Sequence, residues 1–342
     1  MGVNLGELVE PEEISFDDLN DKELAIDAMN TLYQFLSIIR QRDGTPLKDS
    51  EGNVTSHLSG LFYRNINLLE KNIRPVFVFD GEMPDLKQKE TSKRRKKREE
   101  AKKEWQRLKE EGKISEAYSK ATQSSKITGD MIEESKELLK AMGLPFVQAP
   151  SEGEAQAAYM ASNEENDIYA VGSQDWDCLL FGAETMVRNL TSRKTRKTSS
   201  GSRKKVSTER IELETVLEDL DVSREKLVWM GVLMGTDFNP DGVKGIGPKT
   251  ALKLVKDYES LENLLEDDKV EWDSDNDPYI IRDFFIEPPV KEADYSFGEP
   301  DPDKIKEILV EKHEFSEDRV ESGVEKLEKA MESRQSGLGS FV

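Results

Sequence analysis

The chain has 342 residues, 36% of them hydrophobic, which is enough to bury a sizeable core and excludes a disordered protein. Its formal net charge of -21 is opposite in sign to that of a typical nucleic-acid binder. The single cysteine, Cys178, excludes an internal disulfide framework and a cysteine zinc cluster, and no stretch suggests a membrane span or a signal peptide. We therefore expect a soluble cytoplasmic protein, a monomer with no membrane partner.

The charge is distributed unevenly along the chain. Residues 257–342 hold 26 acidic and 10 basic side chains, whereas residues 188–205 hold 8 basic side chains and no acidic one. Residues 93–113 are also cationic in excess, with 11 basic and 5 acidic side chains. Basic segments that could contact a polyanion therefore exist inside an acidic protein.

Three short apolar runs predict buried strands, each followed by a helical pattern: ELAIDA at 23–28, PVFVFDG at 75–81 and DIYAVGSQDWD at 167–177. This alternation predicts an α/β fold, in which helices flank a central, twisted and mostly parallel sheet. Ligands of such sheets bind at the carboxyl ends of the strands.

The stretch between Met83 and about Gly129 is highly charged and favours a helix. A solvated helix with alternating charge is one interpretation, and a nuclear-localisation patch is a weaker one. Because the excess charge is cationic, a mobile basic arch over an acidic site is the alternative.

Two further units follow. The stretch VWMGVLMGTDFNPDGVKGIGPKTALKLV joins two helical patterns through a glycine-rich turn. Beyond about Glu259 the chain is acidic and punctuated by proline, and an amphipathic helix is expected from about Asp303.

Acidic residues gather at the ends of the predicted strands and at one predicted helix start. Each could be an ordinary turn or capping residue, and Ser151 would then be the N-cap of a solvated helix start. Because the carboxyl ends of parallel strands meet at one edge of a sheet, a shared site is the alternative. The residues are Asp27, Asp80, Glu152, Glu154, Asp175 and Asp177, with Asp237 added from GTDFNP.

Seven carboxylates cannot share a pocket unneutralised, because like charges raise one another's pKa. Hard divalent cations such as Mg²⁺ prefer oxygen ligands. Two such ions about 4 Å apart can activate water and stabilise the attacking and leaving oxygens of a phosphodiester displacement. The acidic cluster therefore indicates a two-metal phosphodiesterase site.

The chain resembles the flap endonucleases of archaeal type within the structure-specific 5′-nuclease superfamily. The resemblance rests on five motifs in order: IDAMNTLYQFL, VFVFDG, PSEGEAQAAY, SQDWDCLLFG and MGTDFNPDGVKGIGPKTA. It implies a PIN-like nuclease fold with a helical arch and a helix-two-turn-helix motif. It also implies removal of 5′ flaps from branched DNA in Okazaki-fragment maturation and long-patch base excision repair, with an associated 5′–3′ exonuclease activity.

The resemblance also implies roles for particular residues. All seven carboxylates would bind two Mg²⁺ ions, for which Mn²⁺ could substitute, and Lys87 and Arg94 would steer the scissile phosphate. Tyr33 would stack on an unpaired terminal base, unless it is a core tyrosine. The remaining roles fall in the glycine turn. The backbone amides of Gly245 and Gly247, with the side chain of Lys249, would bind a phosphate of duplex DNA. Main-chain carbonyls of the turn, including those of Val243 and Ile246, would bind a K⁺ ion.

The C-terminal sequence SRQSGLGSFV resembles a sliding-clamp-binding motif, with Gln335, Leu338 and Phe341 at the matching positions. Val342 stands where the family usually has a second aromatic residue, which implies weaker binding to the clamp.

The predicted organisation is a nuclease region at 1–82, an arch at 83–130, an internal nuclease region at 131–258 with the helix-two-turn-helix near 227–256, an acidic helical region at 259–330 that packs on the core, and a clamp-binding tail at 331–342.

Two alternatives to a flap endonuclease are another nuclease of the superfamily, acting as an exonuclease or on repair bubbles, and a non-catalytic scaffold that binds DNA junctions or the clamp.

Overall fold

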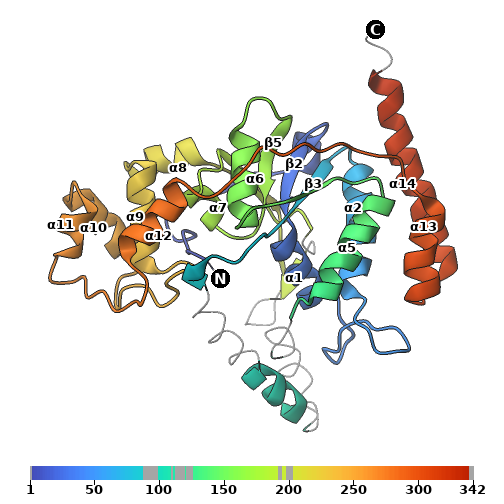
Figure 1. Ribbon diagram of the computed structural model, residues 1–342, viewed down its shortest axis with the longest axis horizontal. Helices are drawn as coiled ribbons and strands as arrows, with labels where there is room; N and C mark the ends of the chain where they lie inside the picture. The colour runs from blue at the N-terminus through green and yellow to red at the C-terminus, as the bar shows by residue number, and fades with distance from the viewer. Residues whose placement is uncertain are drawn as a thin grey trace.

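A seven-stranded sheet forms the centre of the molecule (Figure 1). The computed structural model describes residues 2–87, 99–108, 111, 120, 126–191, 195–197 and 203–338. The strand order is β1-β9-β6-β5-β2-β3-β4. The strands are β1 (Glu12–Ile14), β2 (Glu23–Asp27), β3 (Arg74–Phe79), β4 (Phe146–Gln148), β5 (Ile168–Gly172), β6 (Thr185–Arg188) and β9 (Thr208–Glu212).

The five strands from β6 to β4 run parallel, which confirms the expected mostly parallel α/β sheet. The other edge differs, since β9 is antiparallel both to β6 and to β1. All five residues of β2 are buried, so its sequence reads as a continuous apolar run closed by an acid rather than as an alternating pattern.

Helices cover both faces of the sheet, and alternate strand residues supply the two cores. Leu24 and Phe77 face one core, whereas Ala25 and Val76 face the other. The first core is covered by α1 (Ala28–Ile38), α2 (Ser56–Leu69), α5 (Gly129–Ala141), α13 (Pro302–Lys306) and α14 (Glu317–Leu338). The second is covered by α6 (Gly153–Ser162), α7 (Asp177–Leu180), α8 (Leu213–Leu220), α9 (Arg224–Met234), α10 (Pro248–Asp257), α11 (Leu261–Leu265) and α12 (Pro278–Ile286).

An extended strap, residues 287–300, crosses the molecule from α12 to α13 (Figure 1). The buried amide of Gln156 on α6 holds the strap through two hydrogen bonds with the Lys291 backbone, of 2.7 and 3.0 Å. Farther along, the Tyr295 hydroxyl donates to Glu23 at the start of β2. The strap therefore fixes the C-terminal helices to the sheet.

The prediction of a single helix from about Asp303 is wrong, because the chain forms three separate helical segments there. A π-helical stretch, η3 (Glu307–Lys312), follows α13, and the chain turns before α14 begins. Glu314 takes a left-handed conformation with φ of 58°, and the Phe315 amide donates back to the Leu309 carbonyl. These two features end the helix.

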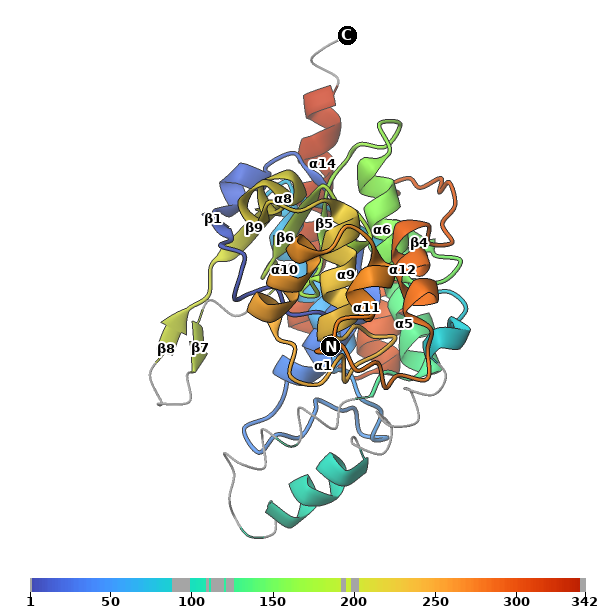
Figure 2. The same cartoon turned by 90° about the vertical axis from the view of Figure 1, so that its left-hand side faces the viewer.

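Two described segments lie outside the central sheet and the helices that cover it. Strands β7 (Thr195–Lys197) and β8 (Arg203–Lys205) pair as a separate hairpin, seen at the lower left of Figure 2. Residues 99–108 are helical and lie below the sheet, inside the segment predicted as an arch. No helix within the described ranges is long and apolar enough to cross a membrane.

Candidate active site

The carboxyl ends of β2 and β3 place the first two acidic residues. Asp27 is the last residue of β2 and also the N-cap of α1, where its carboxylate accepts from the Asn30 amide at 2.9 Å. Asp27 pairs with Val78 in the sheet, and Asp80 lies only two residues beyond Val78, directly after the end of β3. The two side chains therefore lie at the same edge, as the sequence predicted.

The start of α6 brings two more carboxylates to Asp80. The Gly153 amide donates to the Asp80 carboxylate at 2.8 Å, and a Cβ at Gly153 would stand 2.8 Å from the same oxygen. The N-cap of α6 is Glu152, which makes no side-chain cap bond, while the Ser151 hydroxyl donates to the Glu82 carbonyl. The alternative of a Ser151 cap on a solvated helix start is therefore wrong, because Glu152 is buried.

The loop after β5 carries Asp175 and Asp177. The Ser173 hydroxyl donates to Asp27 at 3.2 Å and accepts from the Asp175 amide at 3.2 Å, so this serine joins two of the carboxylates. Asp177 is 2% exposed and opens α7. Ser173 was missed by sequence reasoning, although it stands inside the SQDWD motif.

The N-terminal segment reaches into the same site. The Gly2 amide donates to Asp175 at 3.1 Å, and the Val3 amide donates to Asp177 at 2.7 Å. A Cβ at Gly2 would stand 2.2 Å from an Asp175 oxygen, so only glycine fits there. These contacts were also missed, because main-chain donors leave no pattern in the sequence apart from the small residue.

Lys87 links the acidic cluster to the base of the predicted arch. It ends the short helix η2 (Asp85–Lys87), and its ammonium forms an ion pair with Glu152 and lies 3.4 Å from Asp237. The same ammonium lies 5.5 Å from the centre of the Phe238 ring. Burial lowers the pKa of Lys87, but the attraction of the carboxylates outweighs it, so the pKa is raised and the lysine is charged.

Burial and mutual repulsion shift the carboxyl groups toward their protonated forms. Burial, followed by the charge of Asp80, raises the pKa of Asp27 to about 7. Burial and the charge of Asp175 raise the pKa of both Glu154 and Asp177 well above their ordinary values. Asp80 keeps an exposed edge, yet the protein packed around its carboxylate raises its pKa against the opposing pull of Lys87.

The donor set fits hard divalent cations, since every converging side chain other than Lys87 offers oxygen. Among the described residues, no group of three or more His, Cys, Asp or Glu side chains lies close enough together to hold a metal ion in the present geometry. Burial first, and then the charge of Asp175, raises the pKa of Glu154 and of Asp177, so added positive charge would favour the ionised forms of both groups. Cations that entered would relieve the repulsion.

Other predicted residues lie outside the carboxylate cluster. Tyr33 is 37% exposed on α1, so the alternative of a core tyrosine is wrong. Gly245 and Gly247 lie between α9 and α10, with open space where a Cβ would project, and Lys249 is exposed in the first turn of α10. The glycine turn thus leaves its backbone open to a large partner.

The predicted potassium ligands lie in the same turn, and the predicted clamp-binding residues lie at the end of the chain. Val243 and Ile246 are buried, and the Val243 carbonyl accepts the Ile246 amide at 3.1 Å. Gln335 and Leu338 belong to the last turns of α14, whereas Arg94 and Phe341 lie outside the described residues.

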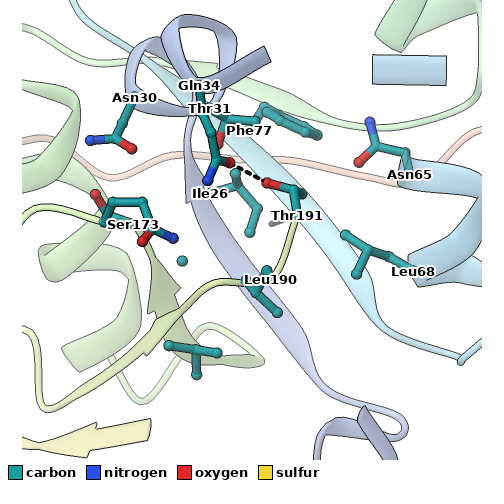
Figure 3. Close-up of a pocket in the computed structure, with 13 residues that line it drawn as sticks. Ile26, Asn30, Thr31, Gln34, Asn65, Leu68, Phe77, Ser173, Leu190 and Thr191 are labelled. Atoms are coloured by element: carbon teal, nitrogen blue, oxygen red, sulfur yellow. Dashed lines mark hydrogen bonds between the residues drawn. The ribbon is translucent and has the colours of Figure 1, made fainter. Parts of the chain in front are cut away.

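A small cavity lies beside the site (Figure 3). It lies among Ile26, Asn30, Phe77 and Ser173, and a hydrogen bond from Thr191 to Gln34 closes one side. Its volume of about 20 Å³ has room for roughly one water molecule. A nucleotide cannot enter it.

Comparisons with known proteins agree with this geometry. The family described as the XPG N-terminal domain matches residues 1–101, and the XPG I-region matches residues 143–237. Flap endonuclease 1 from the archaeon Pyrococcus horikoshii is 50% identical over 351 residues, which cover 100% of this chain and 98% of that protein.

Solved structures give the same result. Flap endonuclease-1 from Methanococcus jannaschii is 42% identical with a TM-score of 0.76, over 97% of this chain and 100% of that one. The catalytic core of Rad2 in complex with DNA substrate is 25% identical with a TM-score of 0.67, over 93% and 96% of the two chains. The chain belongs to the flap endonuclease 1 family, in its archaeal form, and is a structure-specific 5′ flap endonuclease.

Proposed function

We propose that the seven carboxylates hold two divalent metal ions, Mg²⁺ or in its place Mn²⁺, and that the site cuts the DNA strand at the base of a 5′ flap. Enzymes of this family are metal-dependent nucleases. The observation that carries the proposal is the convergence of carboxylates from the ends of β2 and β3, from α6 and from the β5–α7 loop. The raised pKa values of Asp27, Glu154 and Asp177 call for added positive charge there. When bound, two such ions activate water and stabilise both the attacking and leaving oxygens.

The protein's own residues divide the ligands into two groups. Asp27, Asp80, Glu152 and Glu154 come from the strand ends and α6, and would hold one ion. Asp175 and Asp177, oriented by the Gly2 and Val3 amides, would with Asp237 hold the other.

Lys87 supplies the fixed positive charge of the site. Its ion pair with Glu152 keeps the ammonium at the carboxylate edge, where it could neutralise the scissile phosphate as charge develops there. Arg94, seven residues later, would add a second cation if the helical pattern continues.

Duplex DNA would bind at the glycine turn between α9 and α10. The exposed Gly245 and Gly247 let a phosphate approach the backbone amides, and Lys249 adds positive charge. A K⁺ ion bound by carbonyls of the turn, including Val243 and Ile246, would hold the same strand. The Rad2 core that shares this fold was solved with DNA substrate, which supports a DNA-binding role for the turn.

A second contact with the nucleic acid is supported under the predicted arch. A cavity of about 240 Å³ between the 40–54 loop and the helical residues 99–108 is lined by several cations and one aromatic ring. Cations with a stacking surface suit single-stranded DNA. These residues are Arg40, Lys48, Lys102, Lys126 and Trp105.

The biological role that fits is flap removal in Okazaki-fragment maturation and long-patch base excision repair, with some 5′–3′ exonuclease activity. The C-terminal tail would recruit a sliding clamp through Gln335, Leu338 and Phe341.

Metal-ligand variants on three DNA substrates test the proposal. Asp175→Ala and Glu154→Ala should each lower double-flap cleavage in Mg²⁺ to background, while affinity for flap DNA measured without Mg²⁺ changes little, since the ligands serve the chemistry. Glu164→Ala, at an exposed acid after α6, is the matched control and should cut normally.

Cleavage of double-flap, bubble and recessed-end DNA by the wild-type protein separates the members of the superfamily. Preference for the double flap supports the proposal. Equal cutting of bubbles or of recessed ends favours the repair-bubble or exonuclease alternative, and wild-type cutting by Asp175→Ala rejects the metal assignment.

A further inference from the structure

A single side-chain amide joins two parts of the active site that lie far apart in the chain, at Leu86 and at Phe238. The Asn276 amide nitrogen donates to the Leu86 carbonyl at 2.9 Å and to the Phe238 carbonyl at 2.6 Å. Leu86 immediately precedes Lys87, and Phe238 immediately follows Asp237. One residue of the acidic C-terminal region therefore contacts the backbone beside both the lysine and a carboxylate.

Two further hydrogen bonds hold the backbone of Asn276 in place. The Trp272 indole donates to the backbone carbonyl of Asn276 at 3.0 Å, and the backbone amide of Asn276 donates to the Ser274 hydroxyl at 3.3 Å. The next residue, Asp277, is the N-cap of α12. Capping of α12 is therefore done by Asp277 and does not account for the two hydrogen bonds that the Asn276 side chain donates.

Phe238 ties the same place to α12. Its ring is 2% exposed and meets Phe284 and Phe285 edge-on, with ring centres 4.9 and 5.4 Å apart. The face of this ring also lies 5.5 Å from the Lys87 ammonium. Both the backbone before Lys87 and the ring beneath its ammonium are therefore set by residues 276–285.

We propose that Asn276 is a positioning residue for the cut, which holds Lys87 at the carboxylates by fixing its backbone to that of Asp237. This inference rests on the role proposed above for Lys87. An NH₂ group has two donors and can serve two carbonyls at once, which the side chains of Asp and Ala cannot. Without it, two carbonyl oxygens would lose their donor and η2 would lose its link to the turn after α9.

The expected effect is on rate more than on affinity. Asn276→Ala should lower single-turnover cleavage of a double-flap DNA in saturating Mg²⁺ by about tenfold, the size expected for two hydrogen bonds of ordinary strength. The dissociation constant for the same DNA should change by less than about twofold, because the duplex contacts lie elsewhere. Asn263→Ala, at an exposed asparagine on α11, is the matched control and should retain the wild-type rate.

A double-mutant comparison distinguishes positioning of Lys87 from a general structural role. In a Lys87→Ala background, Asn276→Ala should slow cleavage by less than about twofold further, since the residue it positions is gone. A full tenfold loss in that background, an equal loss of rate and affinity, or a wild-type rate for Asn276→Ala would each overturn the inference. Asn276→Asp keeps the shape and removes the donors, and it takes the place of the alanine variant in the same comparison if that variant folds poorly.

The Lys87→Ala variant alone separates this inference from the proposed function. Wild-type cutting by Lys87→Ala would reject the role proposed for the lysine and the inference with it. Slow cutting by Lys87→Ala with normal cutting by Asn276→Ala would reject only the inference.

Discussion

Asp27 combines several structural roles in one side chain. It closes β2, caps α1 through the Asn30 amide and accepts from the Ser173 hydroxyl, while Asp80 faces it across the strand ends. Burial and the charge of Asp80 raise its pKa to about 7. The metal-free folded protein therefore retains a proton on Asp27 at pH values where the unfolded chain has already lost it.

This difference predicts that the metal-free protein becomes less stable as pH rises. Between the unfolded pKa near 3.9 and the folded pKa of about 7, the native state binds more protons, so the free energy of unfolding falls with rising pH. The melting temperature in EDTA should therefore decrease from pH 5 to pH 8. Adding Mg²⁺ should raise it at pH 8 and have little effect at pH 5, where protons compete for the carboxylates.

Asp27→Asn is the control for this pH dependence. The variant cannot ionise at position 27, so its melting temperature should fall less between pH 5 and pH 8. The buried histidines, His57 and His313, are the same in both proteins and cancel in the comparison. Equal slopes for the two proteins would contradict the role of Asp27.

Gly153 is required by the Asp80 carboxylate. Because an added Cβ would stand 2.8 Å from an Asp80 oxygen, Gly153→Ala should displace Asp80 and lower cleavage by about tenfold at little cost in DNA affinity. Single-turnover rates measure the effect. The matched change Gly129→Ala, where nothing lies within 4 Å, should leave the rate unchanged and stabilise the protein slightly. Normal cutting by Gly153→Ala would show that Asp80 tolerates the shift.

At the scale of elements, the β7–β8 hairpin is a small sheet of its own that projects from the body (Figure 2). It belongs to the segment 188–205, which has 8 basic and no acidic residues. Because the excess charge is positive, we expect this element to contact DNA phosphates.

Charge removal from the hairpin should weaken DNA binding and flatten its salt dependence. Replacing Lys197, Lys204 and Lys205 by Ser should reduce the slope of log Kd against log salt by about one for each phosphate that the hairpin no longer neutralises. Fluorescence anisotropy of flap DNA over a salt series measures the slope. Lys326→Ser with Lys329→Ser, on exposed parts of α14, should leave it unchanged. An unaltered slope in the hairpin variant would remove the hairpin from the DNA-binding surface.

Helix α14 leads the chain toward the predicted clamp-binding tail, and its C-terminal end lies on the far side of the molecule from α9–α12 (Figure 1). Deleting residues 335–342 should therefore leave basal flap cleavage unchanged and abolish its stimulation by the organism's sliding clamp. Val342→Phe should tighten clamp binding, since each Å² of apolar area buried contributes about 25 cal/mol before ordering costs. Calorimetry of tail peptides measures this, and no heat from the native peptide would reject the clamp assignment.

For the molecule as a whole, the sequence predicted the centre better than the periphery. The strands β2, β3 and β5 are buried on both faces, so each appears as an apolar run that ends near an acid. Their shared edge, and hence most of the carboxylate cluster, followed from parallel pairing. The antiparallel strands β1, at the edge, and β9, beside it, are largely only half buried or exposed, and they left no comparable pattern.

The missed residues act through groups that a sequence does not display. Gly2 and Val3 contribute main-chain amides, and Asn276 bonds to two main-chain carbonyls. Such contacts depend on where the backbone passes after folding, which local periodicity does not specify. The acidic cluster was predictable because both the carboxylate side chains and their positions at the ends of apolar runs can be seen in the sequence.

The placement of the N-terminal segment affects how the enzyme is made. Gly2 bonds to a carboxylate 173 residues later in the chain, and β1 pairs with β9 only after residue 212 has been synthesised. Asp237 and Asn276 follow later still. Because a nascent chain lacks these partners, it cannot assemble the carboxylate cluster. A nascent polypeptide that stalls before Asp237 has been synthesised therefore carries an incomplete carboxylate cluster and no working nuclease.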